Sequence, residues 1–72
     1  GHSMAQNNLG CLYRDGRGVI QDYKTASTLF RMAAEQGNNH ARTNLGWLYE
    51  RGYGVTQDYR QALQLYTEAA QE

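Results

Sequence analysis

A thiol and an imidazole, Cys11 and His40, are the side chains of this sequence whose types could together support nucleophilic chemistry. A neighbouring imidazole can accept the proton of a thiol, which is the least that a cysteine nucleophile requires. The sequence shows no third residue to orient the imidazole and no oxyanion donor, and a solitary cysteine is more often a small buried hydrophobe. We therefore predict that the protein is not an enzyme, with a cysteine-dependent enzyme as the remote alternative.

Metal and cofactor chemistry is not expected either. A structural zinc site needs four ligands, and the sequence places no suitable cluster of further ligands with Cys11 and His40. The glycine pairs 16/18 and 52/54 are typical of helix ends, where glycine takes the left-handed conformation, and not of loops that bind phosphate. We expect no cofactor and no metal.

The charge balance and the hydropathy argue against two classes of partner. Seven Lys and Arg side chains oppose seven Asp and Glu side chains, so no long-range field attracts nucleic acid. No apolar run approaches the roughly 18 residues that can span a bilayer. The sequence thus predicts neither nucleic-acid binding nor membrane insertion, and a protein or peptide is the expected partner.

One sequence motif occurs twice in the chain, and the elements that it forms must position Cys11 and His40. Residues 9–23 return 36 positions later as residues 45–59, with Leu-Gly-x-Leu-Tyr, Gly-x-Gly-Val and Gln-Asp-Tyr in both copies. Self-similarity at a period of about 20 to 50 residues is typical of repeat folds. The motif therefore predicts a stack of similar units, but a repeat frame by itself does not identify a ligand.

Apolar and small residues recur at helical spacing, which predicts two helices in each copy. The first helix is expected to begin at Ala5, and its inward face would consist of Ala5, Asn8, Leu9, Leu12 and Tyr13. Asn8 and its counterpart Asn44 would then lie on the buried side and form a structural bracket to a neighbouring loop, because a buried amide needs hydrogen-bond partners.

The second helix of each copy is expected to follow an aspartate cap. Asp22 and Asp58 can accept hydrogen bonds from the first free backbone N–H groups of those helices. The inward face of the first capped helix would consist of Tyr23, Ala26, Leu29 or Phe30, Ala33 and Ala34. Glycine inside a helix costs about 1 kcal/mol against alanine, so Gly10 and Gly46 indicate close approach of a neighbouring helix.

The complete pattern resembles a known family. Ala5-x-x-Asn-Leu-Gly-x-Leu-Tyr, then Gly-x-Gly-Val, Asp-Tyr-x-x-Ala and Ala-Ala-x-x-Gly-x-x-x-Ala, is similar to the Sel-one-like repeat (SLR), a tetratricopeptide-like helical hairpin. The resemblance covers residues 5–72 and implies an all-α superhelix of four antiparallel helices, formed by two 36-residue helix-turn-helix repeats. It also implies a non-catalytic adaptor that holds proteins together.

The expected organisation is an expression-tag remnant at residues 1–4, a first repeat at 5–40 and a second repeat at 41–72. His2 is excluded from any site on this ground. About three stacked units are normally needed to bury the apolar faces of such repeats. We therefore expect the pair to be a fragment of a longer array.

A binding groove is predicted on the concave face, because the first helix of each repeat lines that face in tetratricopeptide-like arrays. The groove residues are expected to be Asn7, Cys11, Arg14, Asp15, His40, Thr43, Trp47, Glu50 and Arg51. Trp47 would anchor a peptide, since tryptophan is frequent at binding hot spots, or would pack against the next helix or a partner chain. Arg14 and Arg51 would either bind a carboxylate of the partner or interact with the negative carboxyl end of their own helix.

An alternative role is structural. The last helix has a wide apolar face, and Leu63, Leu65 and Tyr66 are predicted to form a self-association edge. The chain would then be a stacking unit, in a homodimer or in a longer solenoid.

Overall fold

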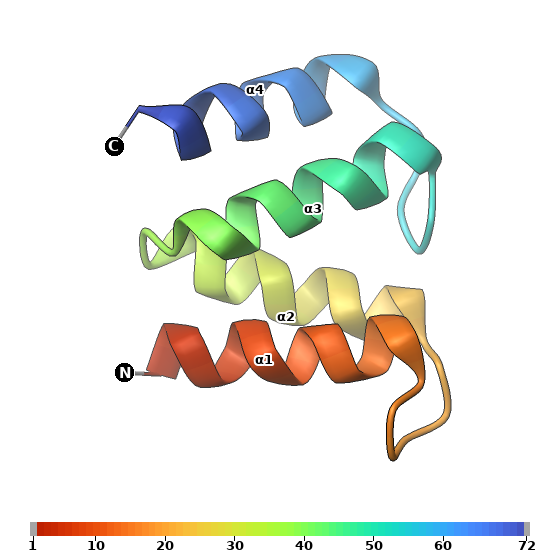
Figure 1. The fold of residues 1–72 in the computed structure, drawn as a ribbon. Coiled ribbons are helices and arrows are strands. Elements are labelled where there is room, and N and C mark those ends of the chain that lie inside the picture. The colour runs from red at the N-terminus through yellow and green to blue at the C-terminus, as the bar shows by residue number, and fades with distance from the viewer. Residues whose placement is uncertain (1, 72) are drawn as a thin grey trace.

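The computed structural model describes residues 2–71, which form the helices α1 (His2–Asp15), α2 (Tyr23–Glu35), α3 (Asn39–Arg51) and α4 (Tyr59–Ala70). Successive helices run in opposite directions and lie side by side in chain order, from α1 to α4 (Figure 1). α2 packs against both α1 and α3, and α4 packs against α3. The predicted all-α fold of two helix-turn-helix repeats is confirmed.

Aspartate caps begin the second helix of each repeat, as predicted. Asp22 and Asp58 each accept from the backbone N–H groups two and three residues further on. The Thr25 hydroxyl also donates to the Asp22 carboxylate at 2.8 Å, and this bond lowers the pKa of Asp22. The long loop of each repeat, residues 16–22 in the first and 52–58 in the second, therefore ends in a fixed geometry.

The core lies between the helices in two clusters. The larger cluster consists of Ala26, Phe30, Leu45, Leu48 and Leu65. The smaller one consists of Ala33, Ala34 and Ala41, where small side chains let α2 and α3 approach at their connection. Phe30 and Leu48 are fully buried, so Phe30 and not Leu29 points into the core from α2.

The predicted inward face of α1 is partly wrong: Tyr13 packs against the core and Leu12 is half-buried, but Ala5, Asn8 and Leu9 are exposed. α1 begins at His2 and not at Ala5, and its buried residues are Asn7 and Gly10, whereas Asn8 is exposed. Leu9 is 41% exposed, but Leu45, its counterpart in the second repeat, is only 3% exposed. The physical reason is position in the stack, because α2 covers the face of α3 that contains Leu45 and no described helix precedes α1.

The predicted apolar edge of α4 is also partly wrong. Leu65 belongs to the core, whereas Leu63 is 67% exposed. Residues two positions apart on a helix point about 200° apart, so both leucines cannot share one face. Tyr66 is half-buried, with its ring against Gly46.

Two of the predicted segments include a residue that the structure does not describe. Gly1 of the predicted tag remnant and Glu72 of the predicted second repeat lie outside the described residues. Ser3 and Met4 belong to the first turn of α1. Whether residues 1–4 are a tag remnant stays a prediction.

Candidate functional site

A groove with a cavity volume of about 550 Å³ opens beside α1 and α3. Its lining residues are Arg14, Asp15, Gln21, Tyr23, Thr43, Asn44, Trp47 and Tyr66. Four of them, Arg14, Asp15, Thr43 and Trp47, were predicted as groove residues from the sequence. The remaining four were not predicted to line this groove, and two of these come from α2 and α4.

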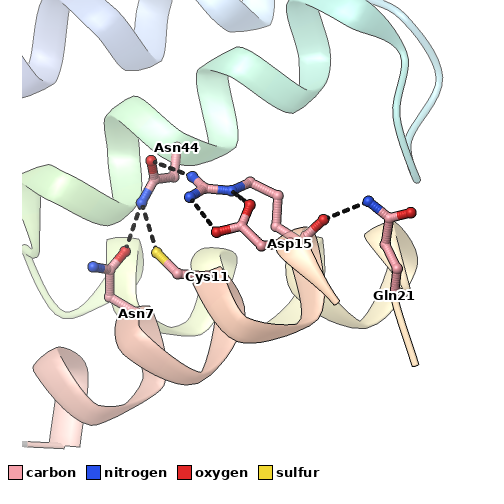
Figure 2. Close-up of polar contacts among 6 residues, drawn as sticks. Asn7, Cys11, Asp15, Gln21 and Asn44 are labelled. Carbon is pink, nitrogen blue, oxygen red and sulfur yellow. Dashed lines mark hydrogen bonds and ion pairs between the residues drawn. The ribbon is translucent and has the colours of Figure 1, made fainter. Parts of the chain in front are cut away.

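Asn44 connects the two helices beneath this groove. Its Nδ2 donates to Oδ1 of Asn7 at 3.0 Å and lies 3.7 Å from Sγ of Cys11, as Figure 2 shows. Its Oδ1 accepts from Nη1 of Arg14 at 3.3 Å. The bracket predicted for Asn44 thus exists, but its partners are side chains of α1. Asn7 is buried by this contact, and Asn8, the counterpart of Asn44, is exposed at the end of the stack.

Arg14 has two acceptors in the groove. Besides Asn44, its guanidinium contacts both carboxylate oxygens of Asp15, at 2.8 and 3.1 Å. This hydrogen bonding raises the pKa of Arg14 and lowers the pKa of Asp15. A ligand carboxylate would therefore have to compete with Asp15 for the guanidinium.

Gln21 and Gln57 hold the ends of the first and third helices, a role that the sequence interpretation missed. Nε2 of Gln21 donates to the backbone oxygen of Arg14 at 2.7 Å (Figure 2), and Nε2 of Gln57 donates to that of Glu50 at 2.9 Å. Carbonyl groups at a helix end lack partners within the helix, so these amides satisfy them. Their recurrence in Gln-Asp-Tyr of both copies was the available signal.

An aromatic cluster forms one end of the groove. The ring of Trp47 meets Tyr53 edge-on, with centroids 5.5 Å apart, and Tyr53 stacks on Tyr23 at 4.8 Å. The guanidinium of Arg51 lies 5.0 Å from the centroid of Trp47, as a cation–π contact. Trp47 is half-buried, so one part of the indole packs on the core while another part lines the groove.

The other predicted groove residues do not line this groove. His40 and Glu50 are exposed on α3, and Glu50 accepts from the Tyr66 hydroxyl at 2.8 Å. Cys11 is half-buried on α1, and its polar neighbour is the amide of Asn44. Within residues 2–71, no three His, Cys, Asp or Glu side chains gather as metal ligands.

Tyr66 should make the stability of the fold sensitive to alkaline pH. Burial, and then the hydrogen bond to Glu50, raises its pKa from 10.0 to about 12. Because the folded state holds the proton more tightly than the unfolded state, this stabilisation is complete below pH 10 and is lost as pH rises from 10 to about 12. We expect Tyr66→Phe to flatten the fall in melting temperature over this window, measured by circular dichroism at several pH values. An equally steep fall in the variant would contradict this assignment.

Comparison with known proteins identifies the type of repeat. The model of the Sel1 repeat family matches residues 3–38 and again residues 39–72. The chain belongs to the Sel1 repeat family. Sel1 repeats generally form helical scaffolds without catalysis and mediate protein–protein interactions. No curated protein matches the chain.

Two solved Sel1-type structures resemble this one along most of its length. A Sel1 repeat protein from Oxalobacter formigenes shares 40% identity with a TM-score of 0.92, over 94% of this chain and 28% of that chain. A protective antigen of uropathogenic Escherichia coli strains, which displays an SLR fold, shares 37% identity with a TM-score of 0.93. That match covers 94% of this chain and 15% of the antigen. This Sel1 chain thus spans less than a third of either solved chain.

Of the helices in residues 2–71, none is both long and apolar enough to cross a bilayer.

Proposed function

We propose that this Sel1 repeat pair is a non-catalytic interaction module that binds a peptide segment of a protein partner in the groove beside α1 and α3. The observation that carries the proposal is Trp47, a half-buried tryptophan that lines a cavity of about 550 Å³. Ligand pockets usually have volumes of about 300 to 1,000 Å³, so the groove has room for a large side chain and its backbone.

The chemistry of the lining favours an uncharged anchor side chain. Trp47 and Tyr23 supply aromatic surface, while Thr43 supplies a hydroxyl at an exposed position. The charge of Arg14 is already balanced by Asp15. We therefore assign the groove to a segment with an apolar or aromatic anchor, whose neighbouring polar groups meet the exposed side chains of α3.

The predicted residues divide into two roles in this proposal. Thr43, Trp47 and Arg51 contact the partner, and His40 with Glu50 extends the contact along α3. Asn7 and Cys11 support the groove indirectly, because they hold Asn44 in place between the helices.

Trp47→Ala should weaken binding far more than it weakens the fold. A display library of random peptides would be selected against the wild-type protein, and the affinity of a selected peptide would be measured by calorimetry. We expect a loss of affinity of at least about thirtyfold, since a hot-spot residue contributes about 2 kcal/mol or more. The melting temperature should fall by less than about 8 °C, which corresponds to about 1 kcal/mol for a domain of this size.

Thr43→Phe is the matched second variant, because Thr43 lines the groove but is exposed. It should block the same peptide and leave the melting temperature unchanged. Thr28→Phe, at an exposed position of α2 outside the groove, is the control and should bind normally. Unchanged affinity in both groove variants, with a large stability loss in Trp47→Ala, would contradict the proposal and make Trp47 a packing residue.

A further inference from the structure

The junction between the two repeats is a tight interface whose residues can be compared with their counterparts on the outer faces of α1 and α4. In this junction α3 packs on α2, and the second long loop lies against the start of α2. Each residue of the junction has a counterpart 36 positions away in the other repeat. Some of these counterparts lie on α1 and in the loop that follows it, and others lie on α4.

Two side chains that the junction buries have apolar counterparts that are exposed. Leu45 is 3% exposed within the junction, and its counterpart Leu9 is 41% exposed on α1. Ser27 is 4% exposed on α2, and its counterpart Leu63 is 67% exposed on α4. A leucine on α4 thus occupies a position that a following repeat would cover.

The loop contacts show the same relation. A Cβ on Gly54 would lie 2.5 Å from the carbonyl group of Tyr23, whereas a Cβ on Gly18 would meet nothing within 4 Å. Tyr53 stacks on Tyr23 at 4.8 Å. Their counterparts are Arg17, which is exposed, and Tyr59, which is 68% exposed.

We propose that a second copy of this chain docks head to tail, with the junction between the repeats as the template. The front edge, defined as Leu9, Arg17 and Gly18, contacts the back edge, defined as Tyr59, Leu63 and Tyr66, of the next copy. Leu9 packs beside Tyr66 and Leu63, as Leu45 packs beside the corresponding part of α2. Of these edge residues Tyr66 alone also lines the peptide groove, whereas Leu9 and Leu63 lie outside its lining.

The loop of the docking copy has a specific place in this arrangement. Gly18 lies on the backbone of Tyr59, as Gly54 lies on that of Tyr23. Arg17 then stands over the ring of Tyr59, where a cation–π contact replaces the stacking of two tyrosines. The docking copy thus covers the exposed ring of Tyr59 and fills the open space beside Gly18.

The symmetry of this contact has a direct consequence. Front and back edges are different surfaces, so a dimer retains one free front edge on one copy and one free back edge on the other. Such heterologous contacts continue into open chains unless the rotation closes a ring. We therefore expect oligomers that lengthen with concentration, and not a symmetric dimer that stops at two.

Blocking one edge at a time tests the arrangement. Leu9→Glu places a charge on the front edge, and Leu63→Glu places one on the back edge. Each variant alone should be monomeric in sedimentation velocity, with association weakened at least about tenfold. A mixture of the two should form dimers that grow no further, because one intact front edge meets one intact back edge. Thr28→Glu carries the same charge outside both edges and should associate like the wild-type protein.

Three results would overturn the proposal. The wild-type protein could remain monomeric up to millimolar concentration, either single variant could still dimerise through two like edges, or the mixture could stay monomeric while the wild type associates. Circular dichroism checks that the variants fold, as their exposed positions lead us to expect. If one does not, Arg17→Asp and Tyr59→Ala block the same two edges and are mixed in the same way.

Discussion

Gly54→Ala is expected to destabilise the protein far more than Gly18→Ala. Both glycines have left-handed φ values, +75° and +78°, so alanine at either position brings a similar backbone strain of about 1–2 kcal/mol. Only at Gly54 would the new Cβ also lie 2.5 Å from backbone atoms of Tyr23. Backbone cannot rotate away as a side chain can, so the second loop must move off the start of α2. We expect an additional loss of about 1–3 kcal/mol.

Urea titration of the two variants would measure this difference. The pair is matched in residue type, conformation and loop position, and differs in whether a neighbouring repeat lies against the glycine. Equal losses would mean that the loop of the second repeat does not need its contact with Tyr23. The measurement should be made at a protein concentration at which the wild type is monomeric, because docking of a second copy would cover Gly18.

The architecture was predictable because the signals that determine it are local and occur twice. Asp22 and Asp58 cap helices through contacts with their own next turn, and that geometry needs no knowledge of the rest of the chain. Helical spacing likewise placed Ala26 and Ala33 on the inner face of α2, and both are buried.

The wrong predictions of burial arise because burial depends on the position of a helix in the stack. The repeated motif does not encode that position. Leu9 and Leu45 have the same local sequence, yet α2 covers only the second of them. The same reason separates Asn8, which is exposed, from Asn44, which hydrogen-bonds to α1. Sequence periodicity describes the faces of a helix, and its neighbours decide which face is buried.

The groove was only partly predictable because several of its contacts join residues far apart in the chain. Arg14 and Glu50 occupy the same position of the motif, but Arg14 contacts Asn44 on α3 and Glu50 contacts Tyr66 on α4. The aromatic cluster depends on Tyr53, whose counterpart is Arg17, so comparison of the two copies could not indicate stacking on Tyr23. Residues that differ between copies require the fold before a role can be assigned.

Gly10→Ala should destabilise the protein, whereas Gly46→Ala should be nearly neutral. Alanine gains about 1 kcal/mol of helix propensity at both positions. At Gly10 its Cβ would lie 2.7 and 2.9 Å from two ring atoms of Phe30, which is fully buried and has no room to shift. At Gly46 the nearest atom is 3.0 Å away, on the half-buried ring of Tyr66. We expect a net loss of about 1–3 kcal/mol at Gly10, by analogy with overpacked cores.

Phe30→Leu tests whether the clash with the ring is the cause. Leucine removes the ring atoms nearest to Gly10, so the double variant with Gly10→Ala should be more stable than the sum of the two single losses predicts. A coupling of about 1 kcal/mol or more, measured by urea unfolding, would show that the missing side chain at Gly10 exists to seat Phe30. Additive losses would instead mean that the destabilisation by Gly10→Ala does not come from the clash with the Phe30 ring. Because Phe30 lies in the same cluster as Leu45, this contact also holds the surface of α2 on which the second repeat is built.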